Sequence, residues 1–205
     1  MLWCVRRGIL GGTFDPPHLA HLVAAEAAFQ QLDLDVVTFM PAGAPWQKAG
    51  RSVSDAGHRW QMTLAATDDV DYIVADDREV TRDGWTYTIE TLEGFGAEED
   101  LVLILGADAA AGLPTWHRSD EVLARVRLAV MPRPGVDREA VEAVAGRVAW
   151  LDTPMLQISG TELRHMRRRG RSIRFLVREP VYRYIVEHAL YVPDDAESLT
   201  RAPVH

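Results

Sequence analysis

The sequence predicts an α/β fold in which helices cover an open, doubly wound parallel sheet. Three observations lead to this prediction. A strand, a helix and a second strand follow one another within residues 8–40, and a right-handed crossover makes such strands parallel. Strand and helix patterns then alternate as far as residue 188. Residues 101–105 are continuously apolar, which is typical of a strand that is buried on both faces.

Each element follows from a local pattern. Short β-branched or apolar runs predict strands around Ile9 and Leu10, and over residues 36–40, 72–75, 101–105, 128–131 and 148–151. Apolar residues at helical spacing and capping residues such as Ser54 or Asp55 predict helices over residues 18–32, 55–67, 88–95, 109–112, 120–125, 137–145, 159–169 and 180–188.

The composition indicates one globular domain over residues 1–192, followed by a loose tail over 193–205. A formal net charge of −8 argues against a general nucleic-acid binder, so a phosphate site has to be a local patch. The single cysteine, Cys4, cannot form an internal disulfide, which fits a reducing cytoplasm. Neither a signal peptide nor a membrane-spanning run is recognisable, so we expect a cytoplasmic protein without a membrane partner.

The first candidate site follows the first strand. We expect Gly11 and Gly12 to form a turn whose backbone N–H groups cradle phosphate. His18 and His21 begin the next helix on one face, because they are three residues apart. Each imidazole can donate a hydrogen bond to a triphosphate and gain positive charge. A tight turn beside two surface histidines is the simpler alternative, but the combination favours a nucleotide site.

A second candidate anion site begins the helix at residues 159–169. Ser159 and Glu162 fit a capping box, which explains those two residues structurally. Thr161 and Arg164 share a face of the first helical turn. A hydroxyl and a guanidinium at that position can bind phosphate oxygens.

Asp108 directly follows the most apolar strand, together with Gly106. Loops at the carboxyl ends of parallel strands form the ligand crevice of such a sheet. Asp108 either caps the next helix or hydrogen-bonds a ribose hydroxyl.

These motifs resemble those of the nucleotidylyltransferase superfamily. Residues 11–21 resemble its signature G-G-T-F-D-P-x-H-x-G-H, and residues 158–164 resemble I-S-S-T-x-I-R. Ala20 departs from the first pattern, and we expect its methyl group to narrow the phosphate site slightly. Gly160 and Leu163 depart from the second, and Gly160 removes a hydroxyl contact to phosphate. The resemblance implies a Rossmann-like nucleotidylyltransferase fold.

Further segments narrow the resemblance to bacterial nicotinate-mononucleotide adenylyltransferases over residues 8–192. They are a lysine-bearing loop, a T-Y-T segment, a G-A-D…L-P-T-W-H segment and a C-terminal pattern, at residues 41–48, 85–92, 106–118, 171–177 and 188–191. The family implies adenylyl transfer from ATP to nicotinate mononucleotide, which releases pyrophosphate and nicotinate adenine dinucleotide. The mononucleotide phosphate itself attacks, so the protein needs no nucleophile, and positioning with charge neutralisation carries the catalysis.

The resemblance also implies roles for individual residues. The catalytic group would comprise His18, His21 and Arg164. ATP would contact Gly11, Gly12, Thr13, Phe14, His18, His21, Lys48, Gly106, Asp108, Ile158, Ser159, Thr161 and Arg164. Nicotinate mononucleotide would contact Tyr87, Thr88, Asp108 and Trp116. Mg²⁺ would be held mainly by the ATP phosphates, with no dedicated protein ligands, while Asp15 shapes the turn.

Several alternatives remain at this point. Phosphopantetheine adenylyltransferases share both phosphate motifs but are shorter and lack the T-Y-T and P-T-W-H segments. A non-catalytic nucleotide-binding protein is the other alternative, since Ala20 and Gly160 depart from the signatures. The basic run at residues 167–171 is interpreted as a solvated helix end that steers anionic substrates, and Trp46 as either a lid or a partner surface. The sequence leaves open homo-oligomer formation and the strictness of selection between nicotinate and nicotinamide mononucleotide.

Overall fold

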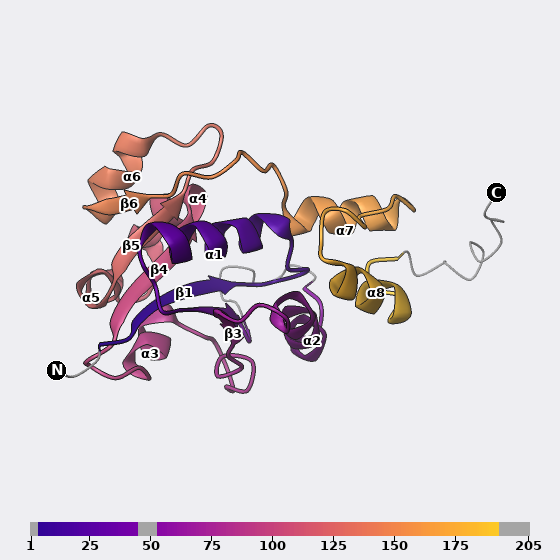
Figure 1. Ribbon diagram of the computed structural model, residues 1–205, viewed down its shortest axis with the longest axis horizontal. Coiled ribbons are helices and arrows are strands. Elements are labelled where there is room, and N and C mark those ends of the chain that lie inside the picture. Colours follow the sequence, from indigo (N-terminus) through magenta and orange to yellow (C-terminus); the bar gives the residue numbers. More distant parts are fainter. Residues whose placement is uncertain (1–3, 45–52, 193–205) are drawn as a thin grey trace.

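The computed structural model describes residues 4–44 and 53–192, and its centre is a six-stranded parallel sheet (Figure 1). The strands lie in the order β3-β2-β1-β4-β5-β6. The chain therefore starts in the middle, extends to one edge and then crosses to the other. The predicted doubly wound fold is confirmed. Its strands are β1 (Arg6–Gly12), β2 (Val36–Pro41), β3 (Ile73–Ala75), β4 (Asp100–Gly106), β5 (Arg127–Met131) and β6 (Val148–Trp150).

Helices connect the strands and extend the chain beyond them. Most lie within one or two residues of the predicted bounds. They are α1 (Leu19–Gln31), α2 (Ala56–Thr67), α3 (Thr88–Glu93), α4 (Ala107–Ala111), α5 (Ser119–Arg125), α6 (Arg138–Ala145), α7 (Gly160–Arg168) and α8 (Glu179–Glu187), with a short 3₁₀ turn at Leu113–Thr115. Across the described ranges, no helix combines the length and apolar character needed to cross a bilayer.

Alternate residues of the central strands pack into two different apolar clusters, as period-two geometry requires. On β4, Val102 and Ile104 belong to one cluster, while Leu101, Leu103 and Leu105 belong to the other. The first cluster receives the small residues of α1, whose alanines allow the helix to approach the sheet closely. The second receives apolar residues from α3, α4, α5 and α6.

A third apolar cluster joins the end of the chain to the beginning of α1. It contains Met62 of α2, Leu163 of α7 and Ile185 of α8, all essentially inaccessible to solvent. Ala20 is fully buried in the same cluster, so its methyl group contributes to this packing. Figure 1 shows that α7 and α8 lie beyond the carboxyl end of β1, where α1 begins. The third cluster therefore brings the second phosphate motif to the first.

The order of strands reverses between β1 and β4. In an open parallel sheet, ligands bind outside the carboxyl ends of the strands at this switch point. β1 ends at Gly12 and β4 ends at Gly106, so both motifs singled out in the sequence reach the crevice. The fold thus positions a binding site between residues that are far apart in the chain.

Two glycines of β1 provide a test of the core packing. A Cβ atom at Gly8 would lie 2.8 Å from Cδ1 of Leu34 and 2.9 Å from Cδ1 of Ile104, whereas one at Gly11 would meet nothing within 4 Å. We expect Gly8→Ala to lower the free energy of unfolding by about 1–3 kcal/mol through overpacking, and Gly11→Ala to change it little. Urea denaturation checks both variants, and equal stabilities would contradict this account of β1.

Candidate active site

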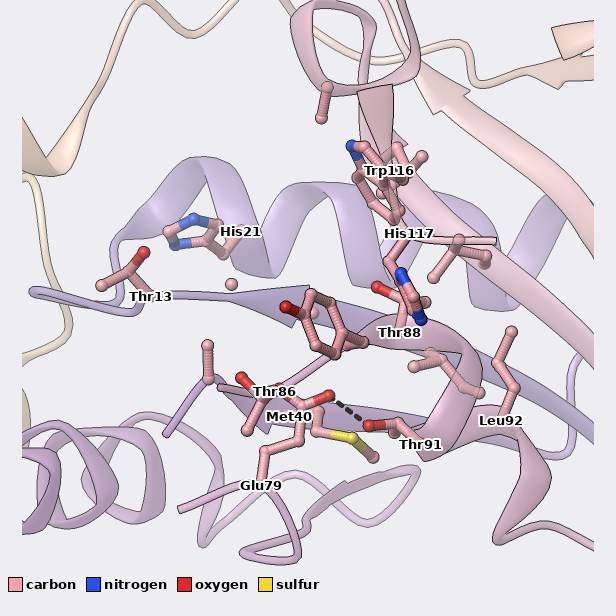
Figure 2. A pocket seen from close by; sticks show the side chains of 18 residues that line it. Thr13, His21, Met40, Glu79, Thr86, Thr88, Thr91, Leu92, Trp116 and His117 are labelled. Atoms are coloured by element: carbon pink, nitrogen blue, oxygen red, sulfur yellow. Dashed lines mark hydrogen bonds between the residues drawn. The ribbon is translucent and has the colours of Figure 1, made fainter. Parts of the chain in front are cut away.

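A cavity of about 320 Å³ opens at the carboxyl ends of the central strands (Figure 2). Gly11, Gly12 and Thr13 line it on the β1 side, next to His21 of α1. Segments that precede α3 and α5 line it on the other side. Figure 2 shows Thr13 and His21 on one side of the cavity, and Trp116 with His117 on the other. The cavity therefore joins the predicted phosphate site to the predicted ring site.

The glycines of the first motif do not form the turn that we expected. Gly11 and Gly12 belong to β1 and pair with Met40 and Pro41 of β2. The chain adopts a left-handed conformation at Phe14 instead, where φ is 48°. A Cβ atom at Gly12 would lie 3.2 Å from the Phe14 ring. A side chain at this position would therefore be tightly packed against the aromatic ring, which folds back against the strand.

The Phe14 ring packs against two other aromatic rings next to the cavity. Its side chain is buried and stacks on Phe39, with ring centroids 5.2 Å apart. The edge of His21 meets it at 4.9 Å. Phe14 is also absent from the cavity lining among the described residues. The predicted contact between the Phe14 side chain and ATP is therefore not open in this structure.

His18 and His21 form a stacked pair at the beginning of α1. His18 is the N-cap residue, and the two ring centroids are 3.7 Å apart. The backbone N–H of His18 donates to Nδ1 of His21 at 3.1 Å. Because Nδ1 accepts this bond, neutral His21 carries its proton on Nε2, which can donate to a ligand.

Burial, together with the nearby charge of Arg133, lowers the pKa of His18 from its usual 6.5 to about 4. His18 is therefore neutral at pH 7 in the free protein, so the positive charge that the sequence analysis expects has to be gained when an anion binds. Its side chain is 3% exposed, and Nδ1 finds no hydrogen-bond partner in the described part of the chain. A buried polar atom without a partner costs free energy, so a group that supplies a hydrogen bond there would stabilise this arrangement.

Asp15 connects the first motif to the end of the chain. Its carboxylate accepts hydrogen bonds from Tyr191 Oη at 2.7 Å and from the backbone N–H of Ser54 at 3.2 Å. Arg164 Nη1 donates to the backbone carbonyl of Asp15 at 2.6 Å and lies 3.5 Å from its carboxylate. These contacts make Asp15 a structural residue, the role expected from the sequence.

The buried guanidinium of Arg59 holds the loops that surround the first motif. Arg59 lies on α2 and is only 2% exposed. It donates to the backbone carbonyls of Thr13 at 3.1 Å, Ser54 at 3.0 Å and Gly43 at 2.6 Å, and also to that of Ala42. Sequence reasoning missed this residue because an arginine in an amphipathic helix is usually exposed.

The second motif begins α7 directly beside Asp15. Ser159 is the N-cap residue and accepts from the backbone N–H of Glu162 at 3.2 Å, so the predicted cap is confirmed. Thr161 is exposed and lies 3.4 Å from Arg164 Nη2. A Cβ atom at Gly160 would lie only 2.8 Å from the carbonyl oxygen of Asp15. Glycine therefore permits the two phosphate motifs to touch.

Asp108 and Arg133 lie just beyond the carboxyl ends of β4 and β5. The cap of α4 is Gly106, so Asp108 is not a capping residue and its exposed side chain is available to a ligand. Arg133 follows β5, and its Nε would lie 3.5 Å from a Cβ atom at Gly106. This Nε is buried without a hydrogen-bond partner in the described ranges. Arg133 was missed, although a cation directly after a strand is the same signal that identified Asp108.

The remaining predicted residues lie on the ring side or outside the described ranges. Tyr87, Thr88 and Trp116 line the cavity. The ring of His117 lies 4.5 Å from that of Tyr87. Glu79 also lines this part of the cavity and was not expected there. Two residues of the lysine-bearing loop, Trp46 and Lys48, lie outside the described residues.

The pKa of His18 predicts how stability depends on pH. Because its folded pKa is lowered, the unfolded chain binds the proton first, and stability falls as the pH drops from 6.5 through about 4. The loss attributable to His18 is about 3 kcal/mol. We expect His18→Gln to remove this part of the acid sensitivity, while the control His165→Gln, at an exposed position, retains it. Urea denaturation between pH 4 and 7 measures the free energy of unfolding of the three proteins. If this free energy depended on pH in the same way for all three, the acid sensitivity could not be assigned to His18.

Comparison with known proteins agrees with this geometry. The cytidylyltransferase-like family matches residues 9–166. A probable nicotinate-nucleotide adenylyltransferase of Thermoanaerobacter sp. (strain X514) is 38% identical over 203 residues, covering 93% of this chain and 96% of that protein. Its counterpart in Salinibacter ruber is 41% identical over 196 residues, covering 92% and 98%.

Solved structures support the same fold. Nicotinic acid mononucleotide adenylyltransferase of Plasmodium falciparum, in complex with APC, superimposes with a TM-score of 0.76 at 17% identity, covering 91% of this chain and 97% of that chain. At this identity the likeness concerns the fold alone. The sequence relatives, which match nearly end to end, carry the closer assignment: this chain belongs to the nicotinate-nucleotide adenylyltransferase family.

Proposed function

We infer that this protein transfers the adenylyl group of ATP to nicotinate mononucleotide, which yields nicotinate adenine dinucleotide and pyrophosphate in NAD biosynthesis. The observation that carries this inference is the contact between two phosphate motifs beside a ring cavity. Arg164 bonds Asp15 at the point where α7 meets the first motif, next to the histidine pair. The related sequences bear the name of this activity, and the Plasmodium falciparum enzyme has been solved with NaAD.

The chemistry needs positioning more than it needs a protein nucleophile. A phosphate oxygen of nicotinate mononucleotide attacks the α-phosphorus of ATP. A new P–O bond forms while the bond between the α-phosphorus and the bridging oxygen breaks, and pyrophosphate leaves with that oxygen. Groups that bind the phosphates and neutralise the developing charge therefore supply the catalysis.

We assign phosphate binding to groups that surround the first motif. Nε2 of His21 donates to a phosphate oxygen, as argued from the bond at its Nδ1. His18 presents a buried nitrogen that needs a partner, and an anionic oxygen there raises its pKa from about 4 towards neutrality. Thr161, Arg164 and Arg133 add a hydroxyl and two fixed positive charges from the neighbouring elements.

The Mg²⁺ that accompanies ATP would be held mainly by the ATP phosphates. Asp15 is a buried carboxylate of the first motif, and its oxygens already contact Tyr191, Ser54 and Arg164. Phosphate oxygens are therefore better placed to hold the ion than Asp15 is, and Mg²⁺ prefers such ligands. When bound, the ion neutralises charge that builds up on the leaving pyrophosphate.

The ring side of the cavity suits the pyridine ring of the acceptor. Trp116 is half-buried and offers a flat aromatic face to the cavity. Tyr87 and Thr88 lie at the beginning of α3 and line the same space.

A cytoplasmic location accords with these substrates.

The direct test is pyrophosphate release with ATP and Mg²⁺, with the acceptors offered in separate reactions. We expect release with nicotinate mononucleotide and none with phosphopantetheine. Preference for phosphopantetheine would overturn the ring site. Protein that binds ATP but releases no pyrophosphate with any acceptor would instead support a non-catalytic nucleotide-binding role.

Arg164 provides a test of the phosphate assignment. We expect Arg164→Ala to lower kcat by about 10²-fold or more, because a positive charge at the developing phosphate charge is lost. Arg168→Ala removes an exposed arginine near the end of the same helix and serves as the matched control. Steady-state kinetics of both folded variants check the expectation. Equal rates would show that Arg164 acts only as a structural partner of Asp15.

Trp116 provides the corresponding test of the ring site. Trp116→Ala should raise the KM for nicotinate mononucleotide by about tenfold while leaving the KM for ATP nearly unchanged, because stacking area is lost only on the ring side. Trp116→Phe keeps a flat ring and should recover most of the affinity. An unchanged KM for the mononucleotide in Trp116→Ala would indicate that this indole is only part of the core.

A further inference from the structure

A half-buried carboxyl group lies on the ring side of the cavity. Glu79 belongs to the segment between β3 and α3, and it lines the cavity together with Thr86 and Thr91. The hydroxyl of Thr91 donates to Oε1 of Glu79 at 2.6 Å, as Figure 2 shows. A carboxylate is unexpected in a cavity whose assigned ligand is itself a carboxylate.

The surrounding backbone fixes Glu79 in this position. A Cβ atom at Gly43 would lie only 2.0 Å from the carbonyl oxygen of Glu79, so the segment after β2 touches this residue directly. Ala44 pairs with Trp85, and its carbonyl accepts from the backbone N–H of Thr86 at 3.4 Å. Glu79 is therefore locked between the loop that follows β2 and the T-Y-T segment.

The charges around Glu79 do not compensate its burial. Burial raises the pKa of Glu79, and the nearby charge of Asp76 raises it further. Hydrogen bonds from Thr91 and Thr86 and the charge of Arg82 act in the opposite direction but are outweighed. Arg82 is in turn paired with Glu90 of α3 at 3.3 Å.

The other groups that line the cavity are distributed over both of its sides. The titratable ones are His21 on α1, Tyr87 before α3 and His117 before α5. A ligand carboxylate that enters this space thus meets Glu79 in a cavity of about 320 Å³. Two carboxylates that share a poorly solvated site cannot both ionise cheaply, so one of them holds a proton.

We propose that Glu79 couples the uptake of one proton to the binding of nicotinate mononucleotide, and that it thereby makes the choice between acid and amide depend on pH. This inference rests on the proposed function. The proton comes from solvent and resides on the carboxyl group of Glu79 while the nicotinate carboxylate is bound. Nicotinamide mononucleotide binds without uptake of this proton, because its neutral amide can donate a hydrogen bond to ionised Glu79.

The consequence is a pH-dependent selectivity. At a pH below the pKa of Glu79 in the free protein, the proton is already present and nicotinate mononucleotide is favoured. As the pH rises above that value, the affinity for the acid falls relative to that for the amide, by at most about tenfold per pH unit for one proton. The phosphate of the two mononucleotides is the same, so its own titration cancels in the ratio.

Isothermal titration calorimetry on the full chain tests the proposal between pH 5.5 and 8.5. Titrations of each mononucleotide in buffers with different ionisation enthalpies count the protons taken up on binding. We expect the binding of nicotinate mononucleotide to be accompanied by the uptake of as much as one proton more than the binding of nicotinamide mononucleotide within this range. Equal proton uptake for both mononucleotides at every pH would overturn the proposal.

Two sets of variants assign the effect to Glu79. Glu79→Gln keeps an acceptor for Thr91 but cannot titrate, so the difference in proton uptake should vanish. Thr91→Val removes a hydrogen bond that stabilises the ionised form, so the pH range of proton uptake should move upward, while Thr91→Ser should leave it in place. If Glu79→Gln fails to fold, the comparison of the two Thr91 variants decides, and identical profiles would refute the proposal.

A parallel assay of pyrophosphate release separates this proposal from the proposed function. Turnover of nicotinate mononucleotide with pH-independent selectivity would leave the function intact and overturn only the role of Glu79. Failure of nicotinate mononucleotide both to bind and to react at any pH would overturn the function and this inference together.

Discussion

The site depends on one buried cation. The guanidinium of Arg59 lies next to the first motif and donates hydrogen bonds to carbonyl groups in three segments. These are the loop after β1, the chain after β2 and the residue before the N-cap of α2. Carbonyls at such loops have no neighbours in a sheet or helix, and unpaired buried carbonyls are costly. A single side chain satisfies several of them at once. It therefore determines where three independent segments lie relative to one another.

Asp15 has the complementary role on the other side of the same loop. Arg59 holds backbone carbonyls, whereas Asp15 holds a hydroxyl, a backbone N–H and a guanidinium. The burial of Tyr191 and its closeness to Asp15 raise the pKa of the tyrosine, so the hydroxyl stays a donor at neutral pH. The first motif is thus held in place before any nucleotide arrives, by Arg59 at the backbone of Thr13 and by the partners of its own Asp15. Such preorganisation reduces the reorganisation needed when phosphate charge develops.

The sequence predicted the architecture well because it depends on local patterns. Alternating strands and helices define a doubly wound sheet, and the carboxyl ends of β1 and β4 then locate the crevice. The contacts inside the site are different, because they join residues far apart in the chain and depend on burial. Arg59 on a helix and Glu79 in a turn look like solvated charges in the sequence, and only packing shows that the first is buried and the second half-buried.

The error about Gly11 and Gly12 has the same physical origin. Glycine can serve through an unusual φ or through the absence of a side chain, and the sequence does not distinguish these uses. In the structure the second use applies at Gly12, beneath Phe14, and at Gly160, against the carbonyl of Asp15. The departure at Gly160, which suggested a drifted site, is accounted for by the close contact of the two motifs.

The bond between Asp15 and Tyr191 also relates the site to the synthesis of the chain. These residues are separated by 176 positions in the sequence. The loop that contains Asp15 is synthesised early, but one of its hydrogen bonds comes from Tyr191, which is synthesised late. Sheet and helices can assemble during translation, since domains form as the chain emerges. The nucleotide loop, by contrast, is completed only when α8 has been released. A polypeptide that stops short of this tyrosine retains every residue of both phosphate motifs and lacks the hydroxyl that orients them.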